Sequence, residues 1–202
     1  MDLPVDAPPI RIREVKVLAN DWAVLKKTTF DHQRADGRWQ TVSRETYDRG
    51  NGVTILLVNR SARTVLLTRQ FRFPAYVNGV PDGMLIESCA GVLEQVDPVE
   101  AIRQEVSEET GYRVEAPRKL FELFMSPGSV TEKVTFFIAD YDSSQKAERG
   151  GGLEHEGEDI ETLELGFEEA WAMVDDGRII DGKTVILLQH LKIHDSGPMG
   201  DS

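Results

Sequence analysis

The stretch at residues 90–112, AGVLEQVDPVEAIRQEVSEETGY, decides the fold prediction, because it predicts a loop followed by one docked helix. Asp97 is a favourable N-cap, and Pro98 follows it where a missing N–H costs nothing. Glu100 stands three residues after the cap, which is the spacing of a capping box. Gly111 is able to adopt positive φ and marks the end of the helix.

One stripe of this predicted helix is apolar. Val99, Ile102 and Val106 recur at spacings of three and four, which places them on the same side of a helix. Such a stripe has to be buried, so we expect the helix to dock on a hydrophobic core.

Three carboxylates share another face of the helix. Glu105, Glu108 and Glu109 stand at i, i+3 and i+4, about a quarter turn from the apolar stripe at about 100° per residue. Each like-charge pair costs roughly 0.2 to 0.5 kcal/mol in an isolated helix, unless a cation lies among the oxygens. Hard divalent cations such as Mg²⁺ are the natural occupants of such a site. These residues alone leave two interpretations open, a divalent-metal site or a solvated acidic helix face.

The composition is that of a globular protein. The chain has 202 residues, of which 40% are hydrophobic and 29% charged, and this fits one domain with an added subdomain. No apolar run approaches the ~20 residues that span a bilayer, so we expect a cytoplasmic protein without membrane contact. Cys89 is the single cysteine, which excludes an intrachain disulfide and predicts a buried structural thiol.

The charge balance separates two classes of ligand. A net charge of -12 argues against a nucleic-acid surface, which needs clustered Lys and Arg. It permits a small phosphorylated substrate, because divalent metals can bridge an acidic site and an anion while specific Arg or Lys residues add further contacts.

Three strands are expected near the N-terminus, over residues 10–18, 22–30 and 39–47, with a turn at 35–37. They predict a small antiparallel sheet with an exposed face, which is a candidate contact between subunits. Trp22, Arg44 and Glu45 lie in this sheet.

The remaining elements follow from the same patterns. Strands are expected over residues 53–59, 64–72, 85–89, 113–116, 119–125, 134–141 and 162–165, and helices over 167–176 and 184–194. Loops are expected at 73–84, 126–132 and 149–159, the last being rich in glycine and acids and expected to be mobile. Residues 1–9 and the tail from 195 are expected to be disordered. Mixed strands with three helices predict an α/β or α+β sandwich.

The segment at residues 91–112 resembles the Nudix box, G-x5-E-x7-R-E-U-x-E-E-x-G-U with U apolar. The REUxEExGU part is matched at Glu105, Val106, Glu108, Glu109 and Gly111.

The match departs from the pattern in three places. The box is one residue short before the helix, Asp97 stands where Glu is usual, and Gln104 takes the Arg position while Arg103 precedes it. The roles of Asp97 and Arg103 therefore stay open.

The shortened spacing is similar to that of the GDP-mannose pyrophosphatase branch of the superfamily. Similarity to this branch extends to YDRGNG at 47–52, RQFR at 69–72, IESCAG at 86–91, KLFELFMSPG at 119–128 and DGKTVILL at 181–188. The resemblance implies a Nudix α/β/α sandwich with a mixed sheet over 48–194, and an N-terminal sheet over 1–47 exchanged across a homodimer. It also implies Mg²⁺-dependent hydrolysis of GDP-mannose to GMP and mannose 1-phosphate, with Mn²⁺ as a possible substitute.

The resemblance implies a metal-binding set. The Ala90 carbonyl, Glu105 and Glu109 would bind Mg²⁺ directly, and Glu108 would bind another ion or act as an outer partner. An acid in the 149–159 loop region would bind metal or activate water. Glu158 aligns best for this role among five candidates, the others being Glu154, Glu156, Asp159 and Glu161.

The resemblance also implies substrate contacts. Arg72 and Lys183 would bind phosphate, although a strand-end salt bridge is an alternative for Arg72. Lys183 lies at a predicted helix start, where its charge opposes the helix dipole. Trp22, Arg44 and Glu45 would recognise base and sugar, reaching in from the partner subunit. Ala90, Gly91, Val92 and Glu132 would make further contacts with the substrate. Packing for Trp22 and a hairpin-end charge for Glu132 are the alternatives.

Two other functions remain open from the sequence. The first changes the substrate to ADP-ribose or another nucleoside-diphosphate sugar, since the box and the metals are shared. The second is a non-catalytic nucleotide-binding protein on the same fold. Retention of Glu105, Glu108 and Glu109 argues against the second, because a binding protein does not need a repulsive cluster.

Overall fold

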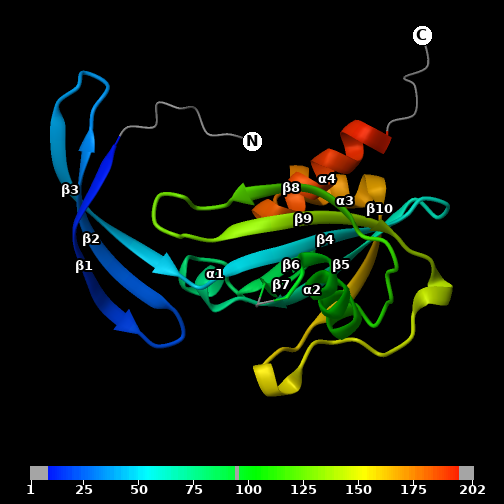
Figure 1. The fold of residues 1–202 in the computed structure, drawn as a ribbon. Coiled ribbons are helices and arrows are strands. Elements are labelled where there is room, and N and C mark those ends of the chain that lie inside the picture. The colour runs from blue at the N-terminus through cyan, green and yellow to red at the C-terminus, as the bar shows by residue number, and fades with distance from the viewer. Residues whose placement is uncertain (1–8, 94–95, 196–202) are drawn as a thin grey trace, which may run out of the picture. The chain divides into compact units, whose positions relative to one another are not determined.

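The computed structural model describes residues 9–93 and 96–195, which form two compact units (Figure 1). The first unit runs up to Gly50 and includes Phe124–Glu132, and the second holds Asn51–Leu123 and the chain from Lys133 onward. Apart from Pro9 and Asp195, the two ends predicted to be disordered lie outside the described residues. No helix of the described part is long and apolar enough to cross a membrane.

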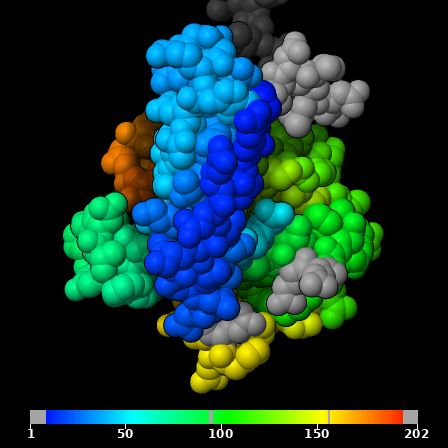
Figure 2. Space-filling view, turned by 60° about the vertical axis from the view of Figure 1, so that its left-hand side comes forward, coloured from blue at the N-terminus to red at the C-terminus, as the bar shows by residue number. Residues whose placement is uncertain are grey.

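The first unit carries the predicted three-stranded antiparallel sheet. Its strands are β1 (Ile10–Asn20), β2 (Val24–Gln33) and β3 (Trp39–Asp48), in the order β1-β2-β3. The predicted turn between β2 and β3 is confirmed, with Gly37 at φ +82°. Every residue of β1 is exposed, and Figure 2 shows this strand uncovered along the visible face.

A buried carboxylate joins the three strands. Asp31 on β2 accepts hydrogen bonds from Arg13 Nε on β1 at 2.6 Å and from Thr41 Oγ1 on β3 at 2.7 Å. Hydrogen bonds to charged groups are among the stronger ones, so Asp31 holds both outer strands to the middle one.

The second unit is built on a seven-stranded mixed sheet. Its strands are β4 (Asn51–Asn59), β5 (Thr64–Phe71), β6 (Met84–Glu87), β7 (Cys89–Leu93), β8 (Arg118–Phe124), β9 (Lys133–Asp140) and β10 (Glu161–Gly166). The helices of the described part are α1 (Phe73–Val77), α2 (Pro98–Glu105), α3 (Phe167–Asp175) and α4 (Gly182–Asp195). Figure 1 shows α3 and α4 on one face of the sheet and α2 on the other, which confirms the predicted α/β/α sandwich.

In the middle of this sheet, strands β4 and β5 separate, and the segment that holds β6 and β7 pairs between them. Strands β4 and β5 pair only near their shared hairpin, through Leu57–Asn59 and Thr64–Leu66. Beyond that point β6 pairs with β5 and β7 pairs with β4, both antiparallel. Ser88 lies at the change of partner, where its hydroxyl is 2.7 Å from Thr54 Oγ1 and its N–H donates to Thr184 Oγ1 at 2.6 Å. The chain therefore enters Cys89 and Ala90 in the centre of the unit.

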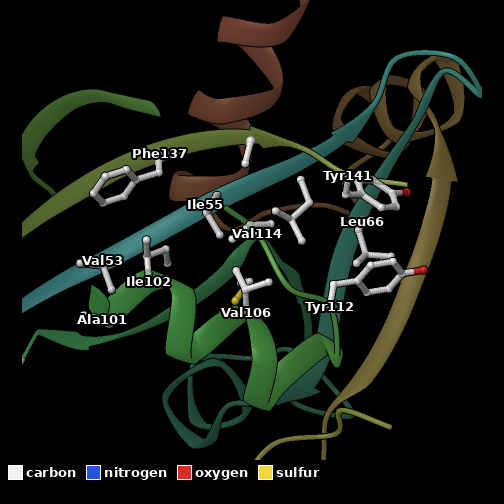
Figure 3. Packing of buried hydrophobic residues seen from close by; sticks show 13 residues of the cluster. Val53, Ile55, Leu66, Ala101, Ile102, Val106, Tyr112, Val114, Phe137 and Tyr141 are labelled. Carbon is white, nitrogen blue, oxygen red and sulfur yellow. The ribbon is translucent and has the colours of Figure 1, made fainter. Parts of the chain in front are cut away.

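The core between α2 and the sheet is the one that the helix pattern predicts. Ile102 and Val106 are fully buried, and they lie with Val53, Ile55 and Phe137 of the sheet in Figure 3. Val99 packs against the same cluster, so the whole predicted stripe is confirmed.

Three local predictions are wrong in part. The predicted loop at 73–84 contains α1, which starts with Pro74 in its first turn, where the missing N–H is harmless. The predicted single strand at 85–89 is two strands that change partner at Ser88, and the second continues to Leu93. No strand forms at 113–116, where the pairing is limited to an isolated antiparallel bridge between Tyr112 and Lys146.

Candidate active site

The acidic helix begins at its predicted cap, whereas Glu100 pairs with Arg103 in place of the predicted capping-box contact. Asp97 caps α2 by accepting a hydrogen bond from the Val99 N–H at 2.9 Å. Glu100 accepts from Arg103 Nη1 at 2.8 Å, on the helix surface. Asp97 thus has a structural role as a cap, and Arg103 has a partner within its own helix.

The end of the helix is wider than a regular α-helix. Residues Val106–Thr110 form a π-helical turn, and Gly111 closes it at φ +75°. π-Helical turns inside α-helices occur often at functional sites, because they shift the phase of the side chains that follow. Here the turn carries Glu108 and Glu109.

Glu109 is the most buried carboxylate of the group. It is 1% exposed, its Oε2 accepts from the Ala90 N–H at 3.3 Å, and the Cys89 thiol donates to it. Burial raises the pKa of Glu109 to about 8, the hydrogen bond from Cys89 opposes this rise, and the negative charges of Glu105 and Glu158 add to it. The carboxylates of α2 and of the glycine-rich loop thus act electrostatically on the one in the π-helical turn.

The Glu105 carboxylate lies against Gly91 of β7. A Cβ built on Gly91 would lie 1.8 Å from Glu105 Oε1, so the carboxylate packs directly on the backbone of β7. Any side chain at position 91 would displace the Glu105 carboxylate. Glu108 makes a different contact, since it accepts a hydrogen bond from Gln104 Nε2 at 2.9 Å.

Glu158 is the loop acid that influences Glu109. Its Oε2 accepts from the Leu153 N–H at 2.9 Å, which holds the carboxylate against its own loop. Of the other candidates, Glu161 faces Arg69 at 3.4 Å, and Glu154 and Asp159 are exposed. The side chain of Glu156 lies outside the described part.

The two predicted phosphate-binding cations lie on either side of a buried acid that sequence reasoning missed. Glu87 is 2% exposed and accepts from Arg72 Nε at 2.8 Å and Nη2 at 3.1 Å. Lys183 Nζ lies 3.5 Å from Glu87 Oε2 and 2.7 Å from Asp181 Oδ1. Burial lowers the pKa of Arg72, but pairing with Glu87 outweighs it and the net shift is upward.

A sequence signal for Glu87 exists. It is a lone charge in the apolar run MLIESCA, and a charge in a buried strand must be paired. Asp181 also accepts from the Thr184 N–H at 2.9 Å and so caps α4.

The predicted base-recognition residues lie in the first unit. Arg44 and Glu45 line a cavity of about 620 Å³ together with Phe30, Phe124 and residues 127–131. Trp22 is 72% exposed, so it is not packed in the core of this chain.

Glu132 is held by a cation of the same unit. It pairs with Arg49 at 3.2 Å, and the Arg49 guanidinium lies 5.7 Å from the Trp22 ring. In the second unit, Val92 is an exposed residue of β7 and follows Gly91.

The donor set of the carboxylate cluster fits a hard divalent cation that is completed by other oxygens. Within residues 9–93 and 96–195, no three Asp, Glu, His or Cys side chains form a ready-made metal site. Mg²⁺ typically takes one or two carboxylates and fills its remaining positions with water and substrate phosphate. Mutual repulsion around Glu109 is the kind of strain that a cation relieves.

Comparison with known proteins agrees with this fold. The chain belongs to the Nudix family, because the family model of the NUDIX domain matches residues 48–188. Members of this family are hydrolases that generally use a divalent metal. A second family model, described as the GDP-mannose pyrophosphatase NudK N-terminal domain, matches residues 9–47.

Similar proteins carry one name. A GDP-mannose pyrophosphatase of Pectobacterium atrosepticum is 56% identical over 182 residues, covering 90% of this chain and 93% of that protein. Proteins of the same name from Klebsiella pneumoniae and Yersinia enterocolitica are 55% and 52% identical, each covering more than nine tenths of both chains.

Proposed function

We propose that this chain hydrolyses the diphosphate bridge of GDP-mannose to GMP and mannose 1-phosphate with Mg²⁺. The observation that supports it most is the identity of 52–56% to proteins named GDP-mannose pyrophosphatase over about nine tenths of the chain. The carboxylate cluster around the buried Glu109 supports the same chemistry.

The proposed metal ligands are the Ala90 carbonyl, Glu105, Glu109 and Glu158. A bound divalent cation would neutralise charge on the diphosphate and orient the attacking water. Glu158 would hold or accept a proton of that water, and Glu108 would support the cluster from outside. Mn²⁺ would substitute for Mg²⁺, since both prefer oxygen ligands.

The chain's own cations would bind the phosphates. Arg72 uses Nε and Nη2 on Glu87, which leaves Nη1 for a phosphate oxygen. Lys183 uses two of its three N–H donors on Asp181 and Glu87, which leaves the third. Water oxygen forms the new bond to phosphorus, the bridging P–O bond breaks, and the released proton passes to a carboxylate.

Recognition of base and sugar is assigned to Trp22, Arg44 and Glu45, and further substrate contacts are assigned to Ala90, Gly91, Val92 and Glu132. We place the first three on residues 1–47 of the partner in a homodimer, and the catalytic machinery on residues 48–194. The exposed apolar side chains of β1, including Ile12 and Val17, support a subunit contact there. The free thiol of Cys89 fits a reducing compartment such as the cytoplasm.

A substrate assay tests the proposed reaction. Purified protein is incubated with Mg²⁺ and, separately, GDP-mannose, ADP-ribose and ADP-glucose, and products are followed by phosphorus NMR. We expect GDP-mannose to be consumed fastest, and Glu109→Gln to abolish its turnover. Strong preference for ADP-ribose would overturn the substrate assignment, and no turnover of any compound would favour the binding-protein alternative.

The subunit contact has a separate test. Sedimentation of the wild type should give twice the chain mass, and Ile12→Lys with Val17→Lys should give the single-chain mass. A wild-type monomer would contradict the homodimer.

A further inference from the structure

The loop that carries Glu158 is fastened to the end of the acidic helix by its main chain. The Gly151 N–H donates to the Glu109 carbonyl at 2.9 Å, and the Gly152 N–H donates to the Glu108 carbonyl at 3.0 Å. The last carbonyls of a helix have no donor within the helix, so an outside partner has to supply one. The loop supplies these donors to the two residues whose side chains belong to the acidic cluster.

The attachment requires glycine on both sides. A Cβ on Gly150 would lie 2.5 Å from the Thr110 carbonyl carbon and 2.7 Å from the Gly111 nitrogen. A Cβ on Gly111 would lie 2.3 Å from the Glu148 carbonyl oxygen. The two backbones are therefore in direct contact, at a distance that no other residue type permits.

Gly152 of the same loop also packs directly against the Glu158 carboxylate. A Cβ on Gly152 would lie 2.6 Å from Glu158 Oε2, and the neighbouring Leu153 N–H holds that oxygen at 2.9 Å. The Ile160 N–H donates to the Gly151 carbonyl at 3.0 Å and closes the loop, with Ile160 buried. The Glu109 carbonyl and the Glu158 carboxylate therefore accept hydrogen bonds from residues two apart in the same loop, Gly151 and Leu153.

We infer that Gly150, Gly151 and Gly152 are positioning residues that set the Glu158 carboxylate relative to Glu109. All three adopt the left-handed region, with φ of +70°, +111° and +80°. A run of glycines loses much conformational freedom on ordering, and the main-chain hydrogen bonds to Glu108 and Glu109 offset that loss. The role of these glycines in catalysis rests on the proposed function, whereas the attachment itself does not.

The test compares two glycines of the same loop. Gly157 has φ +77°, but an added Cβ would meet no described residue beyond its chain neighbours within 4 Å, whereas Gly150 combines φ +70° with a backbone clash. Both alanine variants carry the same left-handed strain, so a difference between them reports the clash. We expect Gly157→Ala to keep turnover of GDP-mannose, and Gly150→Ala to lose roughly 100-fold, as misplacement of a reacting group by about 1 Å does.

A double variant separates positioning from general damage. If Gly150 acts through Glu158, then Gly150→Ala combined with Glu158→Gln should be no slower than Glu158→Gln alone. A further loss of the same size in the double variant, or equal losses in Gly150→Ala and Gly157→Ala, would overturn the inference.

Amide hydrogen exchange gives a readout that needs neither substrate nor variant. In the wild type the Gly151 and Gly152 amides should exchange more slowly than in the unfolded chain, because both are donors to the helix end. Exchange at the unfolded rate would overturn the attachment even if GDP-mannose is turned over. Protected amides in a protein that turns over no nucleotide sugar would instead contradict only the proposed function.

Discussion

Glu109 combines full burial with two neighbouring carboxylates, and its protonation is therefore coupled to folding. Its pKa of about 8 in the folded protein lies above the ordinary value of 4.5. Between these two pH values the folded state keeps a proton on Glu109 that the unfolded state has released. The contribution of this proton to the free energy of unfolding is fully present below pH 4.5. It is lost as pH rises from there through about 8, at roughly 1.4 kcal/mol per pH unit.

The metal-free protein should therefore lose stability between pH 5 and pH 9, and Glu109→Gln should remove most of that loss. Urea unfolding in the presence of a chelator, at a series of pH values, measures both proteins. A wild type and variant with the same pH slope would contradict the assignment to Glu109.

Glu87 offers a second prediction for a single residue. Glu87→Gln leaves Arg72 and Lys183 with one weaker acceptor, so we expect a loss of about 1.5–3 kcal/mol in unfolding free energy, the size of a hydrogen bond to a charged group. Because Arg72 loses its fixed orientation, KM for GDP-mannose should rise more than kcat falls.

Glu161→Gln is the matched control, since Glu161 faces Arg69 on the surface at 3.4 Å. A surface pair contributes about 0–1 kcal/mol, so this variant should be close to wild type in stability and KM. Equal changes in unfolding free energy and KM in Glu87→Gln and Glu161→Gln would contradict the prediction that the buried pair contributes more than the surface pair.

At the scale of elements, α2 depends on its cap. Asp97→Ala should cost about 1 kcal/mol, because the Val99 N–H loses its acceptor, while turnover of the folded protein stays close to wild type. Glu100→Ala should cost less, since the pair that Glu100 makes with Arg103 lies on the helix surface. Denaturant unfolding measures both, and loss of turnover without loss of stability in Asp97→Ala would place Asp97 in the reaction.

At the scale of the whole molecule, metal binding should stabilise the folded chain. A ligand that binds only the folded state adds about 2.7 kcal/mol at 100 times its Kd. Mg²⁺ should therefore raise the Tm of the wild type, and much less that of Glu109→Gln. KCl at matched ionic strength is the control, and an equal rise with KCl would indicate charge screening instead of binding.

Much of the second unit could be predicted from local pattern. The cap at Asp97, the buried stripe of Ile102 and Val106, and the glycine end at Gly111 all follow from chemistry within one helix. The predicted strand at 113–116 is wrong, because a strand depends on a distant partner and the pairing here is an isolated bridge between Tyr112 and Lys146.

The candidate site could be predicted less completely. Glu105 and Glu109 are marked by their spacing, whereas Glu87 is marked only by its lone charge in an apolar strand. The glycines at 150–152 predict a mobile loop, and the structure shows main-chain hydrogen bonds from Gly151 and Gly152 to the helix end. Local sequence does not reveal these bonds, because their acceptors lie about 40 residues earlier in the chain.

The sequence by itself determined the acidic helix, the alternation of strands and helices, and the resemblance that identifies the family. These features depend on neighbours within one or two helical turns, or on a contiguous motif. Tertiary structure decided that Glu87 lies between Arg72 and Lys183, and that the glycine loop before Glu158 is hydrogen-bonded to the Glu109 carbonyl. The physical reason is that burial and pairing of a charge depend on chain segments far apart in sequence, which only packing brings together.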